Sequence, residues 1–248
     1  MKQPHLLCDT GDLAERAIVV GDPARVARLA RLLDNPKKVA QNREFISWRG
    51  EFGGKPIAIV STGIGGPSAA IAVEEMIRCG VKVIVRVGSC GSLLPAVKIG
   101  QLVIPDSAVR GDGTTFAYAP ASLPAVADFD LFHQLRLAAI AAGTPFHTGT
   151  IVSVDGLYAP NLYERKEKLG NLGVLAQEME GSTVLLVSRL RHVRAGCVFV
   201  VVNRAGVKNV QEGILRYAEQ ATSKKGSLID QETKAAQIAL SALIKTDE

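Results

Sequence analysis

Three glycine-containing loops carry residues that can bind a small anion. They span residues 21–25, 61–66 and 86–91, and the first and third contain Arg25 and Arg86. Glycine lets the backbone approach a ligand closely, and the N–H groups at a helix start favour negative charge. The two guanidinium groups suit bidentate contacts with phosphate. Each loop alone is more typical of an ordinary turn, because none matches the P-loop or the dinucleotide-binding fingerprint.

Arg86 is a sharper signal because of its neighbours. It lies in residues 81–87, a run of β-branched residues broken only by single basic positions, which predicts an interior strand. A buried arginine needs an anionic partner, which is either a carboxylate of the protein or a ligand. The sequence leaves both alternatives open.

Two other polar pairs could contact a ligand. Glu178 and Glu180 are separated by one residue, so their side chains point to the same side if the backbone is extended and to different sides if it is helical. A carboxylate at a strand end can accept hydrogen bonds from the cis hydroxyls of ribose, although acids at a helix start also simply complement its dipole. Asn203 and Arg204 follow the apolar run 197–202, where they read a ligand or form a turn.

These residues must be positioned by elements that alternate along the whole chain. Short apolar runs typical of strands alternate with longer amphipathic segments typical of helices. Strands are expected at residues 17–20, 38–48, 56–61, 81–87, 101–109, 148–154 and 197–202. Helices are expected at residues 23–33, 67–79, 128–142, 158–169, 179–190 and 230–244. The alternation predicts an α/β protein, with residues 1–248 forming a single domain around a largely parallel or mixed sheet.

Several local features complete this interpretation. Asp22 and Pro23 are typical of a helix start, and Arg28 falls outside the apolar face of that helix, which predicts a solvated side chain. Residues 88–92 read as a tight loop after the strand that holds Arg86. Residues 205–229 are polar and rich in Lys, Gln and Gly, which predicts a loop or a mobile segment.

Composition excludes several classes of protein. Hydrophobic residues make up 47% of the chain and charged residues 21%, which fits a compact protein. The formal net charge of +5 permits an anionic ligand, but aromatic residues are only 5%, so we expect no nucleic acid partner. The longest apolar stretch is too short to span a membrane. No metal-binding spacing of Cys or His occurs, and the four cysteines predict free thiols in a reducing, cytoplasmic setting.

Taken in order, these segments resemble the nucleoside phosphorylase family, and its uridine phosphorylase branch in particular. The matching stretches are VVGDPARV (19–26), QNREF (41–45), STGIGGPSAAIAVEEM (61–76), VIVRVGSCGSL (83–93), LPAVADFD (123–130), QEMEGST (177–183) and VVNR (201–204). The resemblance implies a three-layer α/β/α domain around a mixed, partly barrel-like sheet. It also implies a pentosyltransferase that splits a nucleoside with inorganic phosphate as co-substrate, without metal or cofactor.

The resemblance assigns roles to individual residues. The phosphate would be held by Gly21, Arg25, Arg43, Arg86 and Ser89, with Arg43 reaching the site of a neighbouring subunit. The ribose would be bound by Glu178, Met179 and Glu180, with His5 reaching the neighbour's ribose 5′-hydroxyl. Shared sites of this kind imply a homo-oligomer, and the family implies a hexamer built from three dimers.

The base is the least conventional part of the match. Purine-specific hexameric members carry an aspartic acid where this chain has Asn203, and an amide cannot act as a general acid. Arg204 can instead stabilise an anionic carbonyl, which favours departing uracil. Uridine phosphorylases recognise uracil with a glutamine and an arginine that follow a Tyr-Pro turn. Here the glutamine is missing, and Arg165 can take the place of the arginine only if the turn contains an insertion. Leu157 occupies the position where a phenylalanine that stacks on the base is expected. Inosine, guanosine or methylthioadenosine is therefore the alternative substrate.

Two other functions remain as rivals to phosphorolysis. One is a nucleosidase of the same fold, which uses water, although three phosphate-binding arginines would be unnecessary for it. The other is a non-catalytic nucleic-acid-binding protein, for which the sequence has no basic run or interleaved aromatic residues.

Overall fold

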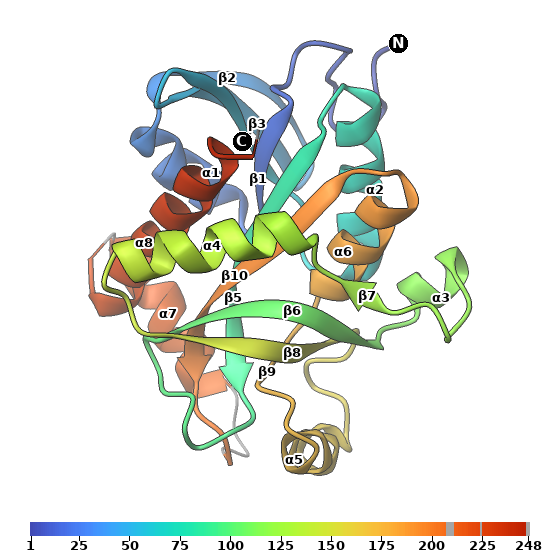
Figure 1. Ribbon diagram of the computed structural model, residues 1–248, viewed down its shortest axis with the longest axis vertical. Helices are drawn as coiled ribbons and strands as arrows, with labels where there is room; N and C mark the ends of the chain where they lie inside the picture. Colours follow the sequence, from blue (N-terminus) through green and yellow to red (C-terminus); the bar gives the residue numbers. More distant parts are fainter. Residues whose placement is uncertain (207–210, 224, 247–248) are drawn as a thin grey trace.

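Strands and helices alternate along the chain in the computed structural model, which describes residues 1–206, 211–223 and 225–246 (Figure 1). The strands are β1 (Arg16–Val20), β2 (Asp34–Asn42), β3 (Phe45–Phe52), β4 (Lys55–Ser61), β5 (Val83–Ser92), β6 (Leu102–Gly111), β7 (Ala125–Val126), β8 (Phe146–Val154), β9 (Ala176–Glu178) and β10 (Arg194–Asn203). The helices are α1 (Pro23–Leu29), α2 (Gly66–Arg78), α3 (Thr114–Tyr118), α4 (Phe129–Ala141), α5 (Leu162–Asn171), α6 (Gly181–Leu190), α7 (Gln211–Ser223) and α8 (Ser227–Leu243).

The strands of the described residues form one mixed sheet that partly closes on itself. β1 lies between β4 and β5 and runs parallel to both. β5 also pairs with β10, and the pairings continue through β6, β8 and β9 back to β5. These five strands therefore close a barrel, while β1 to β4 extend the sheet as an open wing. The expected mixed, partly barrel-like α/β fold is confirmed.

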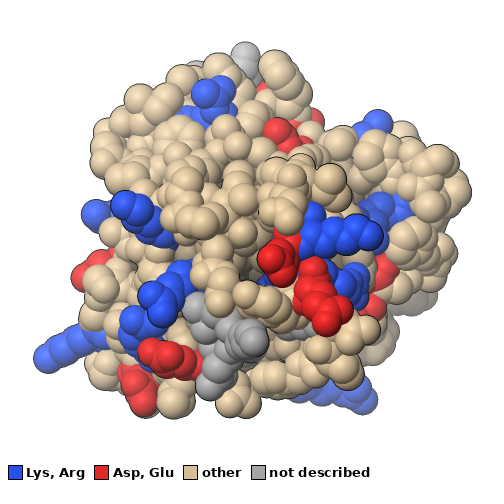
Figure 2. Space-filling model, turned by 90° about the horizontal axis from the view of Figure 1, so that it is seen from below, with Lys and Arg blue, Asp and Glu red and all other residues tan. Residues whose placement is uncertain are grey.

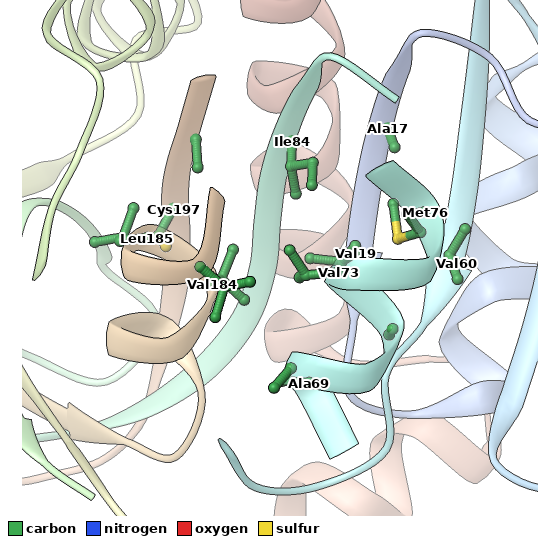
Figure 3. Packing of buried hydrophobic residues seen from close by; sticks show 14 of the residues in the cluster. Ala17, Val19, Val60, Ala69, Val73, Met76, Ile84, Val184, Leu185 and Cys197 are labelled. Atoms are coloured by element: carbon green, nitrogen blue, oxygen red, sulfur yellow. The ribbon is translucent and has the colours of Figure 1, made fainter. Parts of the chain in front are cut away.

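The helices cover both faces of this sheet because the strand side chains alternate. Ala17 and Val19 of β1 pack into the cluster that α2 and α6 cover, and Figure 3 shows them beside Val73 and Met76 of α2. Ile18 and Val20 point the other way, into the cluster that includes buried residues of α1, α4 and α8. The period of two in a strand thus produces a helical layer on each side.

Two local predictions around the sheet were wrong. Residues 38–48 were expected as one strand, but they contain the turn between β2 and β3 at Arg43 and Glu44. Residues 88–92 were expected as a tight loop, but β5 continues through Ser92 and pairs there with β10 and β9. The glycines of this stretch allow close packing, since an added Cβ at Gly88 would lie 3.0 Å from the Phe199 ring.

The polar stretch 205–229 was predicted as a loop, and this prediction was also wrong for much of its length. Residues 211–223 form α7, and α8 begins at Ser227, whereas 207–210 and 224 lie outside the described residues. Gly213 and Tyr217 are the buried residues of α7. Ala221 also packs on the core, so Gly213, Tyr217 and Ala221 follow each other at helical spacing, but they lie among polar residues and the composition of the stretch favoured a loop.

Candidate active site

Four of the residues singled out by the sequence lie at the carboxyl ends of neighbouring strands. Gly21 follows β1, Ser89 lies near the end of β5, and Asn203 ends β10. Because β1, β5 and β10 run parallel, their carboxyl ends meet at one edge of the sheet. Glu178 reaches the same region at the end of β9, which pairs with the last residues of β5. Ligand sites in open α/β sheets lie at this edge.

Arg86 is buried at this edge and paired with both glutamates. Its side chain is 4% exposed, its Nε lies 3.2 Å from Oε2 of Glu178, and its Nη2 donates to Oε2 of Glu180. Burial disfavours the charge, but Glu180 and Glu178 outweigh it and raise the pKa of Arg86. Nη1 is buried and has no hydrogen-bond partner among the residues that the structure describes. The carboxylates therefore satisfy part of the guanidinium and leave one edge for an anion.

Glu178 is held by the start of α6. Its carboxylate accepts hydrogen bonds from the N–H groups of Glu180 and Gly181 at 2.9 and 2.8 Å, and from the Ser153 hydroxyl on β8. Burial raises its pKa, while Arg86 and these donors act in the opposite direction. The sequence left an extended backbone and a helix start open as alternatives. Both occur, because Glu178 is the last residue of β9 and Glu180 is the N-cap of α6.

Glu180 connects the second glycine loop to Arg86. Its Oε1 accepts a hydrogen bond of 2.6 Å from the N–H of Gly65, while Oε2 accepts from Arg86. Gly65 has φ +91°, a left-handed conformation that favours glycine. Each carboxylate oxygen has two lone pairs, so Glu180 retains acceptor capacity for hydroxyl groups of a ligand.

Arg25 is the second buried arginine of the site. Its Nη1 donates to the Val87 carbonyl at 3.2 Å, its Nη2 donates to the Tyr217 hydroxyl at 2.6 Å, and its Nε lies 2.9 Å from Oε2 of Glu232. Burial opposes the charge, but Tyr217 and Glu232 outweigh it and raise the pKa of Arg25. Arg25 and Arg86 are close enough for the charge of Arg25 to act against that of Arg86.

The prediction that Arg28 is solvated was wrong. Its side chain is 12% exposed, and its Nε lies 3.1 Å from Oε1 of Glu232. Nη2 also pairs with Asp22, which caps α1 by accepting from the N–H of Ala24. The apolar stripe of α1 gave no sign of this pair, because its partner Glu232 lies on α8, far along the sequence.

The backbones of the first two glycine-containing loops, residues 21–25 and 61–66, approach each other closely at Gly21. An added Cβ there would lie 3.3 Å from the carbonyl oxygen of Gly63, so the first two glycine loops pack against each other. Ser89 is partly exposed on β5, opposite Val200 of β10. Ser89 therefore lies three residues beyond Arg86, toward the carboxyl end of the same strand.

His5 and Arg43 lie together on a different part of the surface. Nδ1 of His5 is 2.7 Å from the buried Glu75 carboxylate, and its backbone carbonyl accepts from the Asn42 side chain. Arg43 follows Asn42 in the turn between β2 and β3 and is exposed. Arg43 thus faces outward, whereas the His5 side chain is 36% exposed and its ring is paired with the buried Glu75.

A cavity of about 240 Å³ adjoins the carboxyl ends of β5 and β10, where α5 covers them. Asn203 and Arg204 are among the residues that line it. α5 contributes Tyr163 and Lys166 to the lining, and burial lowers the pKa of Lys166. Arg165, proposed from the sequence, lies on α5 with an exposed side chain and is not part of this lining.

Sequence reasoning missed four residues that hold the site, namely Ser153, Tyr217, Glu232 and Lys166. Ser153 and Glu232 carry no local signal, since each lies within an ordinary strand or helix pattern. Tyr217 is an aromatic residue in a polar stretch, which was the one visible sign of a buried contact. Met179, between the two glutamates, is partly buried.

The face around the cavity has mixed charge. Figure 2 views the molecule from below Figure 1, where α5 and the carboxyl ends of β5 and β10 lie, and basic and acidic side chains alternate there. Among the described residues no cluster of three or more His, Cys, Asp or Glu could hold a metal ion. All four cysteines are free and buried. None of the helices described has the length and apolar character needed to cross a bilayer.

The fold and this edge define an α/β protein with two buried arginines at parallel strand ends. Residues 15–245 match the model of the phosphorylase superfamily, to which the chain therefore belongs. Guanosine phosphorylase of Halorubrum lacusprofundi is 42% identical over 81% of this chain and 83% of its own. Uridine phosphorylase of Escherichia coli is 39% identical over 81% and 85%. The crystal structure of uridine phosphorylase from Vibrio fischeri superimposes with a TM-score of 0.87 at 32% identity, covering 98% of both chains.

Proposed function

We propose that this protein is a nucleoside phosphorylase, a pentosyltransferase that converts a nucleoside and inorganic phosphate into free base and ribose 1-phosphate. Uridine is the favoured substrate. The observation that carries this proposal is the buried Arg86, whose Nη1 has no hydrogen-bond partner beside the equally buried Arg25. Two guanidinium groups at a strand edge suit a phosphate dianion. The uridine phosphorylases among the relatives support the choice of substrate.

In the proposed reaction phosphate is the nucleophile. It attacks the anomeric carbon of the nucleoside through an oxocarbenium-like transition state, while the bond to the base breaks. Arg25, Arg86, Gly21 and Ser89 bind and orient the phosphate against the sugar, an effect of position and electrostatics. Because phosphate supplies the attacking oxygen, the chemistry requires no nucleophile from the protein, and we propose that it uses no metal or cofactor.

The ribose would be fixed by Glu180, assisted by Met179 and Glu178. Glu180 Oε1 and Oε2 are held by Gly65 and Arg86, and their remaining lone pairs can accept from two cis hydroxyls. Glu178 keeps Arg86 in place. As the glycosidic bond breaks, its electron pair leaves with the base and positive charge develops on the sugar, which this carboxylate pair would stabilise.

The departing base would lie in the cavity lined by Asn203 and Arg204. An arginine can stabilise the anionic carbonyl of uracil, and an amide can hydrogen-bond its edge. Arg165, exposed on α5, would have to turn inward to contribute. A 6-oxopurine is the second candidate, favoured by the similarity to a guanosine phosphorylase.

We further propose that the active enzyme is a homo-oligomer of the hexameric type. The exposure of Arg43, next to the Asn42 side chain that donates to the His5 carbonyl, supports a site that a neighbouring subunit completes. The four buried free thiols support a reducing compartment, in line with a cytoplasmic enzyme.

The test is turnover of a nucleoside panel with and without phosphate. Uridine, thymidine, inosine, guanosine, adenosine and methylthioadenosine are each incubated with purified protein, and free base is measured. We expect base release from uridine that depends on phosphate. Cleavage without phosphate would point to a nucleosidase, preference for inosine or guanosine to the purine alternative, and no turnover of any nucleoside would refute the proposal.

A further inference from the structure

We propose that Glu232, together with Tyr217, is a positioning group for phosphate binding by Arg25. This inference rests on the proposed function, because it assigns Arg25 to the phosphate. Glu232 lies on α8 and Tyr217 on α7, both outside the strand-end loops that form the site. Their effect on the reaction would pass entirely through the guanidinium group of Arg25.

Some N–H groups of the Arg25 guanidinium are used by the protein, and others are left to bind an anion. Nε faces Glu232, one N–H of Nη2 is used by Tyr217, and one N–H of Nη1 is used by the Val87 carbonyl. Each terminal nitrogen carries two N–H groups. One donor on Nη1 and one on Nη2 are thus left for an anion. The centroid of the Tyr217 ring lies 5.5 Å from the guanidinium carbon of Arg25, so the ring packs against the guanidinium group and helps to hold its orientation.

Glu232 is suited to fixing because it holds several donors at once. It is 2% exposed, and its two oxygens contact Nε of Arg25, Nε and Nη2 of Arg28, and the Tyr217 hydroxyl. The two arginines both belong to α1, which starts at the phosphate loop. One carboxylate on α8 therefore fixes the helix and the guanidinium that lead to the ligand.

Tyr217 extends this arrangement to α7. Its hydroxyl accepts from Arg25 and donates to Glu232, so a single proton aligns both groups. Burial raises the pKa of this hydroxyl, which keeps the proton available for Glu232. Replacement of the tyrosine by phenylalanine would remove that bridge and retain the ring.

Two effects of Glu232 on phosphate oppose each other. Its charge repels an incoming dianion, so its removal would tighten binding if charge alone mattered. Its removal also leaves Arg25 and Arg28 buried with too little compensating charge, which drives the guanidinium groups toward water and out of the binding geometry. Misplacement by about 1 Å is costly for a bidentate contact, so we expect the loss of position to dominate.

The test compares Glu232→Gln and Tyr217→Phe with the wild-type enzyme. KM for inorganic phosphate, KM for the nucleoside that the wild type cleaves, and kcat are measured separately, and the rise in melting temperature with phosphate alone is recorded. The matched control is Glu74→Gln on α2, which removes the carboxylate that pairs with Arg191, an arginine that is 46% exposed and outside the site.

We expect Glu232→Gln to raise the phosphate KM about tenfold or more and Tyr217→Phe about threefold, with the nucleoside KM within about twofold. The stabilisation by phosphate should shrink in the same order, and the control should behave as wild type. An unchanged or lower phosphate KM, or an equal rise in both KM values, would overturn the inference.

The second variant and the wild-type measurements separate a folding defect, a failure of the proposed function and a failure of the positioning role. If Glu232→Gln does not fold, Tyr217→Phe decides the question alone, since it removes one hydroxyl and keeps the packing. If the wild type releases no base and gains no stability with phosphate, the proposed function has failed. If the wild type depends on phosphate while both variants match it, only the positioning role has failed.

Discussion

Arg86 and Glu178 form a buried ion pair, with Nε 3.2 Å from Oε2, although the residues lie on different strands of the sheet. The pair exists because β9 joins the end of β5 and delivers Glu178 to the carboxyl edge where Arg86 is already buried. Ser153 and the first N–H groups of α6 complete the acceptor set of the glutamate. The site is thus a charged cluster within the barrel wall and not a loop added to its surface.

Replacing Arg86 tests the centre of this cluster. Arg86→Ala removes the guanidinium and leaves Glu178 and Glu180 buried without their partner, so we expect kcat/KM to fall about 100-fold or more, mainly through phosphate. Arg86→Lys keeps the charge without the fork and should recover part of the loss. Steady-state kinetics with varied phosphate provide the measurement. Wild-type kinetics in Arg86→Ala would remove this residue from the site.

The hydroxyl of Ser153 should stabilise the fold through Glu178. It donates to Glu178 and accepts from the N–H of Ser182, so Ser153→Ala leaves both groups short of a partner in the interior. We expect the free energy of unfolding to fall by about 1–3 kcal/mol. Urea denaturation measures it, with Ser107→Ala on neighbouring β6 as control, since that hydroxyl is only partly buried. Equal effects of the two variants would contradict a special role for Ser153.

The sheet and its helical layers could be predicted because their signals are local. The β-branched runs of β5 and β10 and the Asp22–Pro23 helix start each carry their own pattern, and the strands formed where expected. The family motifs then led to Arg86 and the two glutamates as a group. Their mutual pairing could not be chosen from sequence, because a buried arginine alone is equally consistent with a carboxylate or a ligand.

What the sequence did not reveal depends on distant contacts. Arg28 reads as a surface residue until α8 brings Glu232 beside it. The segment 211–223 reads as a loop because its polar residues outnumber its apolar ones, although Tyr217 and Ala221 follow Gly213 at helical spacing on the buried face of α7. Residues 88–92 read as a turn because their small residues, which suit close packing next to Phe199, are also the residues typical of turns.

Gly213 offers a test of the α7 position in which two effects oppose each other. An added Cβ would overlap Oδ1 of Asn203 and lie 2.6 Å from the backbone carbonyl oxygen of Val202, so Gly213→Ala must move α7 or the end of β10. Helix propensity alone would favour alanine by about 1 kcal/mol. We expect the clash to dominate, lowering the melting temperature and raising the nucleoside KM.

The matched control for this variant is Ala218→Gly, which weakens the same helix at an exposed position and creates no clash. It should lower the melting temperature slightly and leave the nucleoside KM unchanged. A Gly213→Ala protein with higher stability and wild-type kinetics would show that α7 does not pack against Asn203 in solution.

The buried thiols predict how stability responds to alkaline pH. Burial raises the pKa of Cys79 from 9.0 to about 11, and it raises the pKa of Cys8, Cys90 and Cys197 as well. A group with a higher pKa in the folded state stabilises the fold while it is protonated in both states. This contribution is therefore complete below about pH 9 and is lost as the pH rises through 11.

Urea denaturation at pH 7, 9 and 10.5 should show a falling free energy of unfolding, and Cys79→Ser should reduce the fall. Rapid modification of native protein by iodoacetamide at pH 8 would contradict the burial on which this prediction depends, whereas we expect modification only after unfolding.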